Sequence, residues 1–449
     1  MLSLSFRRFL YTIFVLGFLF SAPMLVFYTA GYRFHFPTQR FIKTGSISLS
    51  SLPRQAMVFL NEKKQGTTPI LLDQLFSGSY KIRLEKPGYI PWEKWVSVKE
   101  TSTTVLENIN LFLEENPLLL SPLSQKTLIN PSGKNFILIL EQAAWIELWQ
   151  SSFDQIEKKL LLRLPQSRSE NLSFKWSALG TYLLIEDNQN EKTHWTVIDL
   201  EKNIQQKIEI NQMSPVSVMW DPDLDDTLYV QFPSGLYVFS LSQQTQEKLS
   251  DKTIMGIARG NDLLFVENSI SQETLFVQKK GKNGLEEIVR SLPKGNYTFL
   301  KAPMFFALLQ DEDQEKIYLF ETSRPNEPLL LSTHAREAFW NPQNPFELLY
   351  VNEFEIHVYN LSTHTNELIT RVSQPIDSIA WHPRANIIFY EENGKIVALD
   401  RYQQIQSATI PMVEMENIQE FWLSVDGKKL YFIGSENRQA SVFERRLQK

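Results

Sequence analysis

The hydrophobic positions of the chain form one long uninterrupted run followed by many short ones. Residues 9–28, FLYTIFVLGFLFSAPMLVFY, carry no charged side chain. An α-helix of that length can cross the ~30 Å hydrocarbon core of a bilayer. Beyond residue 45 the apolar runs are short, rich in β-branched and aromatic residues, and separated by turn residues. This pattern predicts an all-β protein that follows one N-terminal transmembrane helix.

The residues around the long run predict its orientation. Arg7 and Arg8 stand directly before it, and no acidic residue precedes them. Positive charges remain on the cytoplasmic side, so everything after Tyr28 is expected outside the cytoplasm. The alternative is a cleaved signal peptide, whose apolar core is typically only about 7–15 residues long. We therefore expect residues 1–30 to be a cytoplasmic stub and a single-pass anchor in the cell membrane.

A basic, aromatic connector over residues 31–44 leads into a region of short alternating runs. Five strands are expected there, at residues 46–50, 56–60, 79–84, 93–98 and 105–112. Turn residues such as Ser77-Gly78 and Pro87-Gly88 separate them. Five or six strands in so short a stretch predict a minimal β-sandwich over residues 45–113.

The same stretch resembles the PEGA domain, a small β-sandwich of prokaryotic envelope and surface proteins. The resemblance rests on Ser51-Leu52-Pro53, Ala56, Asn61, Gly66, Thr68-Pro69, Leu75, Gly78, Tyr80 and Lys86-Pro87-Gly88-Tyr89. Arg54 and Gln55 replace the Glu and Gly of the motif that names the family. The resemblance implies a spacer or adhesion module without chemistry of its own.

The remainder of the chain, residues 117–449, repeats itself. Trp176 and Trp220 are 44 residues apart, and Trp340, Trp381 and Trp422 follow one another at intervals of 41. The 120 residues between Trp220 and Trp340 accommodate three further units. Each unit contains four short apolar runs, which is typical of a β-propeller blade.

The repeats predict a closed array. Eight units start near Lys126, Asn171, Pro215, Ile254, Asn296, Arg336, Ile376 and Ile418. The last unit has only three strands before the chain ends, and the segment PLLL at residues 117–120 is available as its fourth. Pairing the two would remove an open sheet edge and join the ends of the array. We expect eight blades, with seven as the alternative.

One turn of the repeat carries a second resemblance. Trp422 is followed by Ser424, Asp426, Gly427 and Lys428, and Asn130 by Pro131, Ser132, Gly133 and Lys134. These turns resemble the W-S-P-D-G-K pattern of TolB-like and WD40-like propellers. The resemblance implies a propeller fold for residues 117–449.

Composition removes several classes of function. The chain has 449 residues, a formal net charge of −6 and no cysteine. The absence of cysteine excludes disulfides and thiolate metal sites, and the lack of a basic patch makes a nucleic-acid partner unexpected.

No catalytic, cofactor-binding or metal-binding residue is predicted. The six histidines show no second histidine or acid at ligand spacing on one element, and no phosphate-binding loop or nucleophile elbow occurs. The acidic segment from Asp221 to Asp226 begins like a calcium loop, but Asp226 and Phe232 stand where such a loop needs Gly and Glu. A solvated turn is the favoured interpretation. We expect a protein that is not an enzyme and needs no cofactor, with its binding residues unassigned.

The leading hypothesis is a membrane-anchored scaffold or adhesion protein of the prokaryotic cell envelope, whose propeller binds a protein or a glycan. One alternative is a structural protein resembling a surface layer, which would self-assemble. The less favoured one is a propeller enzyme of unknown substrate, which requires clustered acids, histidines or a metal on one face.

Overall fold

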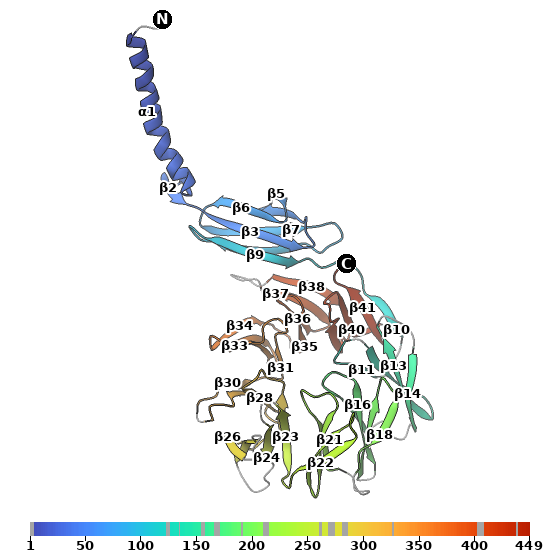
Figure 1. Ribbon diagram of the computed structural model, residues 1–449. Helices are drawn as coiled ribbons and strands as arrows, with labels where there is room; N and C mark the ends of the chain where they lie inside the picture. Colours follow the sequence, from blue (N-terminus) through green and yellow to red (C-terminus); the bar gives the residue numbers. More distant parts are fainter. Residues whose placement is uncertain are drawn as a thin grey trace.

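In the computed structural model of the chain (Figure 1), the residues described form one N-terminal helix followed by β-strands and their connections. The residues it describes are 4–122, 126–133, 135–153, 158–165, 171–189, 192–209, 215–259, 263–267, 274–280, 286–325, 327–401, 408–436 and 439–449.

The expected N-terminal helix is present as α1, Leu4–Thr29. Its segment Phe6–Thr29 has a mean hydropathy of 2.1 and none of it is buried in the protein. It is long and apolar enough to cross a membrane, as an anchor or as a signal sequence. The helix extends away from the rest of the molecule (Figure 1), and the β1–β2 hairpin, Tyr32–His35 and Arg40–Lys43, follows it.

The next seven strands form a β-sandwich. Its strands are β3 (Gly45–Leu52), β4 (Met57–Leu60), β5 (Lys63–Thr67), β6 (Ile70–Leu75), β7 (Gly78–Glu85), β8 (Trp92–Val98) and β9 (Thr103–Asn110). One sheet has the order β6-β3-β9 and the other β5-β4-β7-β8. The sequence pattern did not indicate β5, whose mostly exposed residues KKQGT show no apolar alternation, or β6, which directly follows Thr68-Pro69.

The described residues of the remaining chain form eight four-stranded sheets, arranged around a common centre (Figure 1). Blade 1 contains β11 (Lys126–Ile129), β12 (Asn135–Glu141), β13 (Trp145–Ser152) and β14 (Lys158–Pro165). Blade 2 contains β15 (Leu172–Trp176), β16 (Tyr182–Gln189), β17 (Lys192–Asp199) and β18 (Ile204–Lys207). Blade 3 contains β19 (Ser217–Trp220), β20 (Thr227–Phe232), β21 (Gly235–Ser240) and β22 (Thr245–Ser250). Blade 4 contains β23 (Ile254–Arg259), β24 (Leu263–Glu267), β25 (Thr274–Lys280) and β26 (Glu286–Pro293).

The second half of the array repeats the same order. Blade 5 contains β27 (Tyr297–Leu300), β28 (Phe306–Asp311), β29 (Lys316–Glu321) and β30 (Leu331–His334). Blade 6 contains β31 (Glu337–Trp340), β32 (Glu347–Val351), β33 (Glu355–Asn360) and β34 (Thr365–Arg371). Blade 7 contains β35 (Ile376–Trp381), β36 (Ile387–Glu392), β37 (Lys395–Asp400) and β38 (Ala408–Glu414). Blade 8 contains β39 (Glu420–Leu423), β40 (Lys429–Glu436) and β41 (Gln439–Arg446), joined by β10 (Leu118–Pro122).

The expected pairing of the two ends of the array is confirmed. Strand β10 is antiparallel to β41, with Leu118 opposite Glu444 and Leu119 opposite Phe443. The first strand after the sandwich therefore completes the sheet formed by the last three strands of the chain. All eight predicted starting points lie within two residues of the first strand of a blade.

Four of the five repeating tryptophans take equivalent places, and the fifth does not. Trp176, Trp220, Trp340 and Trp381 each end the first strand of a blade. The backbone N–H of the next residue closes the turn by donating to a carbonyl at the start of the second strand. In blade 7 this is the hydrogen bond from the N–H of His382 to the carbonyl of Ile387. In blade 8 this N–H belongs to Ser424, so Leu423 takes the tryptophan position and the expected equivalence of Trp422 is wrong.

The one-residue shift changes the neighbours of Trp422, because successive side chains of a strand point to opposite faces. Its ring stacks on Tyr431 at 5.8 Å and lies 5.5 Å from the ring of Phe153.

The sandwich and the propeller share a continuous hydrophobic core. Buried residues of both, including Val96 of the sandwich and Phe421 of blade 8, belong to one cluster, and the rings of Phe112 and Phe389 lie 5.7 Å apart. The Trp92 indole N–H donates to Asp400 Oδ2 at 2.8 Å. The sandwich therefore packs against the rim of the propeller at blades 7 and 8 and leaves the ends of the other blades free (Figure 1).

Candidate binding surfaces of the propeller

Each blade presents two ends, which carry different turns. Successive strands of a blade are antiparallel. The turns between the first and second strands therefore all lie at one end of the blades, and the turns between the second and third strands lie at the other end. We call the first end the first-turn face and the opposite end the second-turn face. Loops at the ends of a rigid scaffold are the usual location of binding residues in such folds.

Large apolar side chains stand exposed on the first-turn face. Their turns belong to blades 2, 3, 5, 6 and 8, and the side chains are Leu179, Leu224, Met304, Phe305, Phe346 and Val425. Their exposed fractions range from 40% for Leu224 to 65% for Leu179. Single exposed apolar residues are ordinary, whereas their recurrence on equivalent turns indicates an interaction surface.

A cavity of about 460 Å³ opens among these turns. Its wall combines Leu224 of blade 3 with Leu264 of blade 4 and the blade 5 turn that contains Met304 and Phe305. Phe305 has a φ of 72°, a left-handed conformation that a bulky residue rarely adopts. Its carbonyl accepts the N–H of Thr322, which holds the conformation in place. Maintained strain of this kind is often associated with binding sites.

The acidic segment of blade 3 builds the turn next to this cavity. The segment is the inter-strand turn that the sequence predicts, with Asp223 exposed to solvent, but Asp221 is fully buried and accepts the N–H groups of Asp223 and Leu224. Asp225 accepts the N–H of Leu179 in the neighbouring blade. The carboxylates of Asp221 and Asp225 therefore accept hydrogen bonds from backbone N–H groups and stabilise the turns of blades 2 and 3. In the described part of the chain, no three acid or histidine side chains converge as metal ligands.

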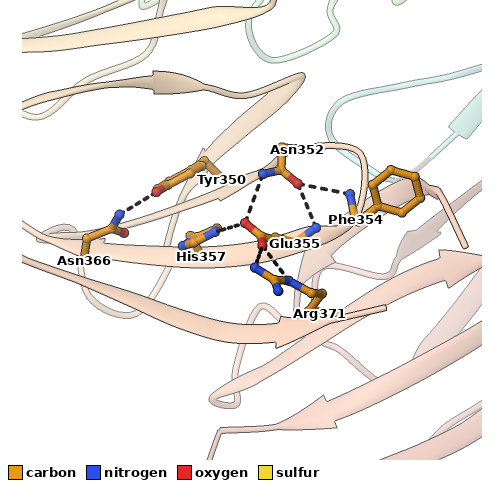
Figure 2. A network of polar contacts seen from close by, with 7 residues as sticks. All are labelled: Tyr350, Asn352, Phe354, Glu355, His357, Asn366 and Arg371. Carbon is orange, nitrogen blue, oxygen red and sulfur yellow. Dashed lines mark hydrogen bonds and ion pairs between the residues drawn. The ribbon is translucent and has the colours of Figure 1, made fainter. Parts of the chain in front are cut away.

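A polar network on blade 6 corrects another expectation from the sequence. Glu355 and His357 stand two residues apart on β33 and so lie on one face, with His357 Nε2 3.0 Å from Glu355 Oε2. Figure 2 shows Glu355 between His357, Arg371 and Asn352, all of which hydrogen-bond to its carboxylate. These hydrogen bonds, that of His357 first, lower the pKa of Glu355 to about 2.

This network is satisfied within the blade. The ring of His357 stacks on Tyr350 at 5.0 Å, and the Tyr350 hydroxyl accepts a hydrogen bond from Asn366 (Figure 2). Arg371 on β34 and Glu355 on β33 thereby join two neighbouring strands near the second-turn face. The network stabilises the outer half of blade 6 and shows no nucleophile or ligand set arranged for catalysis.

Comparisons with known proteins agree with both parts of the fold. Residues 44–114 match the family model of the PEGA domain. The crystal structure of Porphyromonas gingivalis dipeptidyl peptidase 4 has a TM-score of 0.50 at 11% identity, over 75% of this chain and 62% of that one. A crystal structure of the eukaryotic initiation factor also has a TM-score of 0.50, at 12% identity, over 76% of this chain and 94% of that one. No curated protein matches the chain.

The chain is therefore a β-propeller protein that carries a PEGA domain and one N-terminal apolar helix. At these identities the likeness to solved structures concerns the fold alone.

Proposed function

We propose that this protein is a non-enzymatic scaffold of the prokaryotic cell envelope, anchored by α1, whose propeller binds a protein partner through its first-turn face. The observation that carries the proposal is the repeated exposure of apolar side chains on that face, beside a cavity walled by Leu224 and Met304. Apolar anchors that fill pockets dominate the energetics of protein–protein interfaces.

The position of the sandwich supports this assignment. It contacts blade 7 through Trp92 and Asp400, at the first-turn end of β37, and connects the propeller to α1. The apolar side chains on the first-turn face of blades 2, 3, 5 and 6 remain exposed. The apolar character of the exposed side chains favours a protein over a glycan, which would present hydroxyl groups that need polar partners.

Co-purification from detergent-solubilised native membranes tests the proposal. The replacement Met304→Asp puts a charge beside the cavity and should reduce recovery of a discrete partner about tenfold or more, as loss of an interface anchor does. Val105→Asp, on an exposed position of the sandwich, is the matched control and should retain the partner. Equal recovery with both variants would show that the first-turn face is not the docking surface.

A further inference from the structure

The second-turn face carries an acidic cavity of about 690 Å³ between blades 7 and 8. Four carboxyl groups line it, those of Asp377, Glu391, Glu414 and Glu416. They come from the start of β35, the ends of β36 and β38, and the connection from β38 to β39, which the antiparallel order of the blades brings to one end. This cavity lies on the face opposite the one proposed for the partner.

The cavity depends on a close approach of two turns. The N–H of Met415 donates to the carbonyl of Gly394, and a Cβ atom at Gly394 would lie only 2.5 Å from the carbonyl oxygen of Met415. Gly394 also has a φ of 77°, which a residue without a side chain adopts readily. Glycine at this position therefore lets blade 7 contact the connection to blade 8 and form the cavity wall.

Most of the negative charge in the cavity has no counter-charge from the protein. Lys395 pairs with Glu414 at 3.0 Å. Within the residues that the structure describes, no lysine or arginine lies within 4 Å of the carboxylates of Asp377, Glu391 or Glu416. Two more acids begin the first strands of neighbouring blades at the same end, Glu337 on β31 and Glu420 on β39. Partial burial raises the pKa of Glu337.

The environment of Glu391 favours a cationic ligand in this cavity. Its side chain is only 1% exposed, and its Oε1 accepts the N–H of Gly394 at 2.7 Å. Its Oε2 accepts no hydrogen bond from an N–H or hydroxyl group and lies against the carboxyl group of Asp377, with which it can share a proton. Burial, and then the nearby charge of Asp377, raise the pKa of Glu391 to about 7. A buried acceptor beside a like charge is unfavourable until a proton or a cationic donor reaches it, and a bound cation would replace the proton.

The geometry favours an organic cation over a metal ion. No three acid or histidine side chains of the described chain converge as metal ligands, and the cavity is far larger than a single ion. Met415 and Ile418 supply apolar wall beside the carboxylates, which suits a long aliphatic stem ending in a charge. We propose that this cavity binds a lysine or arginine side chain presented by a basic peptide segment.

Titration calorimetry on the full-length protein in nanodiscs at low salt tests the proposal, with hexalysine as the probe. Hexalysine should bind at one site, and Asp377→Asn and Glu391→Gln should each weaken binding about tenfold or more, the effect of losing a charged hydrogen-bond partner. Asp251→Asn is the matched control, because Asp251 is an exposed acid on the same face that pairs with Lys248. That variant should bind like the natural protein.

Several results would overturn the proposal. These are no binding of hexalysine, equal weakening by Asp251→Asn, or calcium that binds more tightly than hexalysine and is lost in the same variants. Spermidine that binds as tightly as hexalysine would make a free polyamine the ligand instead of a peptide. Should Glu391→Gln fail to fold, the exposed Asp377 carries the test alone.

Discussion

A few side chains connect each blade to the backbone of its neighbour. The indole N–H groups of Trp220, Trp340 and Trp381 donate to the carbonyls of Lys175, Lys301 and Phe339 in other blades. The residue that follows the first strand also reaches the following blade: Asn130 of blade 1 hydrogen-bonds to the carbonyl of Gly180, and His382 of blade 7 to that of Gly427. The repeating tryptophan therefore packs within its own blade and satisfies an edge carbonyl of another.

Trp381 is the most buried of these tryptophans and should be the most costly to remove. It is 7% exposed and the guanidinium of Arg401 lies over its ring. Trp381→Ala should lower the free energy of unfolding by about 3–5 kcal/mol, the usual range for a large buried aromatic residue. Chemical denaturation measures it, with the 45% exposed Trp145→Ala as a control that should cost less. A loss below about 1 kcal/mol for Trp381→Ala would contradict the blade register.

Glu355 should make stability depend on pH. Its pKa in the folded protein is about 2, below the ordinary 4.5, so its contribution is fully present above pH 4.5 and is lost as the pH falls toward 2. Glu355→Gln should therefore lower the midpoint of thermal unfolding at pH 7, with a difference that shrinks through this window. Glu353→Gln, on the same exposed turn, is the control. An unchanged difference at pH 2.5 would show that the network of Figure 2 does not depend on the charge.

At the scale of single elements, the sequence predicted the blades, which have a periodic apolar pattern. It did not indicate strands that form only by pairing with a neighbouring strand. Eight blades and the β10–β41 pairing follow from repeats of apolar runs, which each blade needs for its own core. Strand β5 is polar and forms only because β4 pairs with it. Leu179 and Phe346 are exposed in turns, where apolar residues follow no periodic pattern. The sequence therefore did not indicate that they belong to one surface.

Closure by β10 can be tested with two neighbouring prolines. In an edge strand, successive N–H groups point alternately toward the partner strand and away from it, and proline has none. Of Leu118→Pro and Leu119→Pro in the full-length protein, one should lower the midpoint of thermal unfolding by several degrees and the other much less. Both side chains are exposed, so alanine at either position should change little. If neither proline has an effect, β10 does not hold the last blade.

At the scale of the whole molecule, the two proposed binding surfaces lie at the far end from the apolar helix α1. The helix α1 continues through the β1–β2 hairpin into the sandwich, and the sandwich shares its core with blades 7 and 8. Through these contacts, α1 anchored as proposed would position both faces of the propeller (Figure 1). A continuous core also resists the relative motion that small polar interfaces between domains allow.

The proposed topology predicts which parts a protease reaches. Arg7 and Arg8 should keep the N-terminus in the cytoplasm and place the sandwich and the propeller outside. Protease added to intact spheroplasts should digest the chain beyond Gly31 and leave a membrane-embedded fragment. Complete protection of the chain, or recovery of a mature soluble form that lacks the first thirty residues, would contradict an uncleaved anchor.

Site-specific photo-crosslinking in living cells tests the proposed scaffold function most directly, because blade 6 offers a matched pair of phenylalanines. Phe346 lies on the first-turn face and is 48% exposed, whereas Phe354 lies on the second-turn face of the same blade and is 37% exposed. A photoreactive phenylalanine at position 346 should yield a discrete adduct with a second protein that position 354 does not yield. No adduct at 346, or the same adducts at both positions, would contradict a partner on the first-turn face.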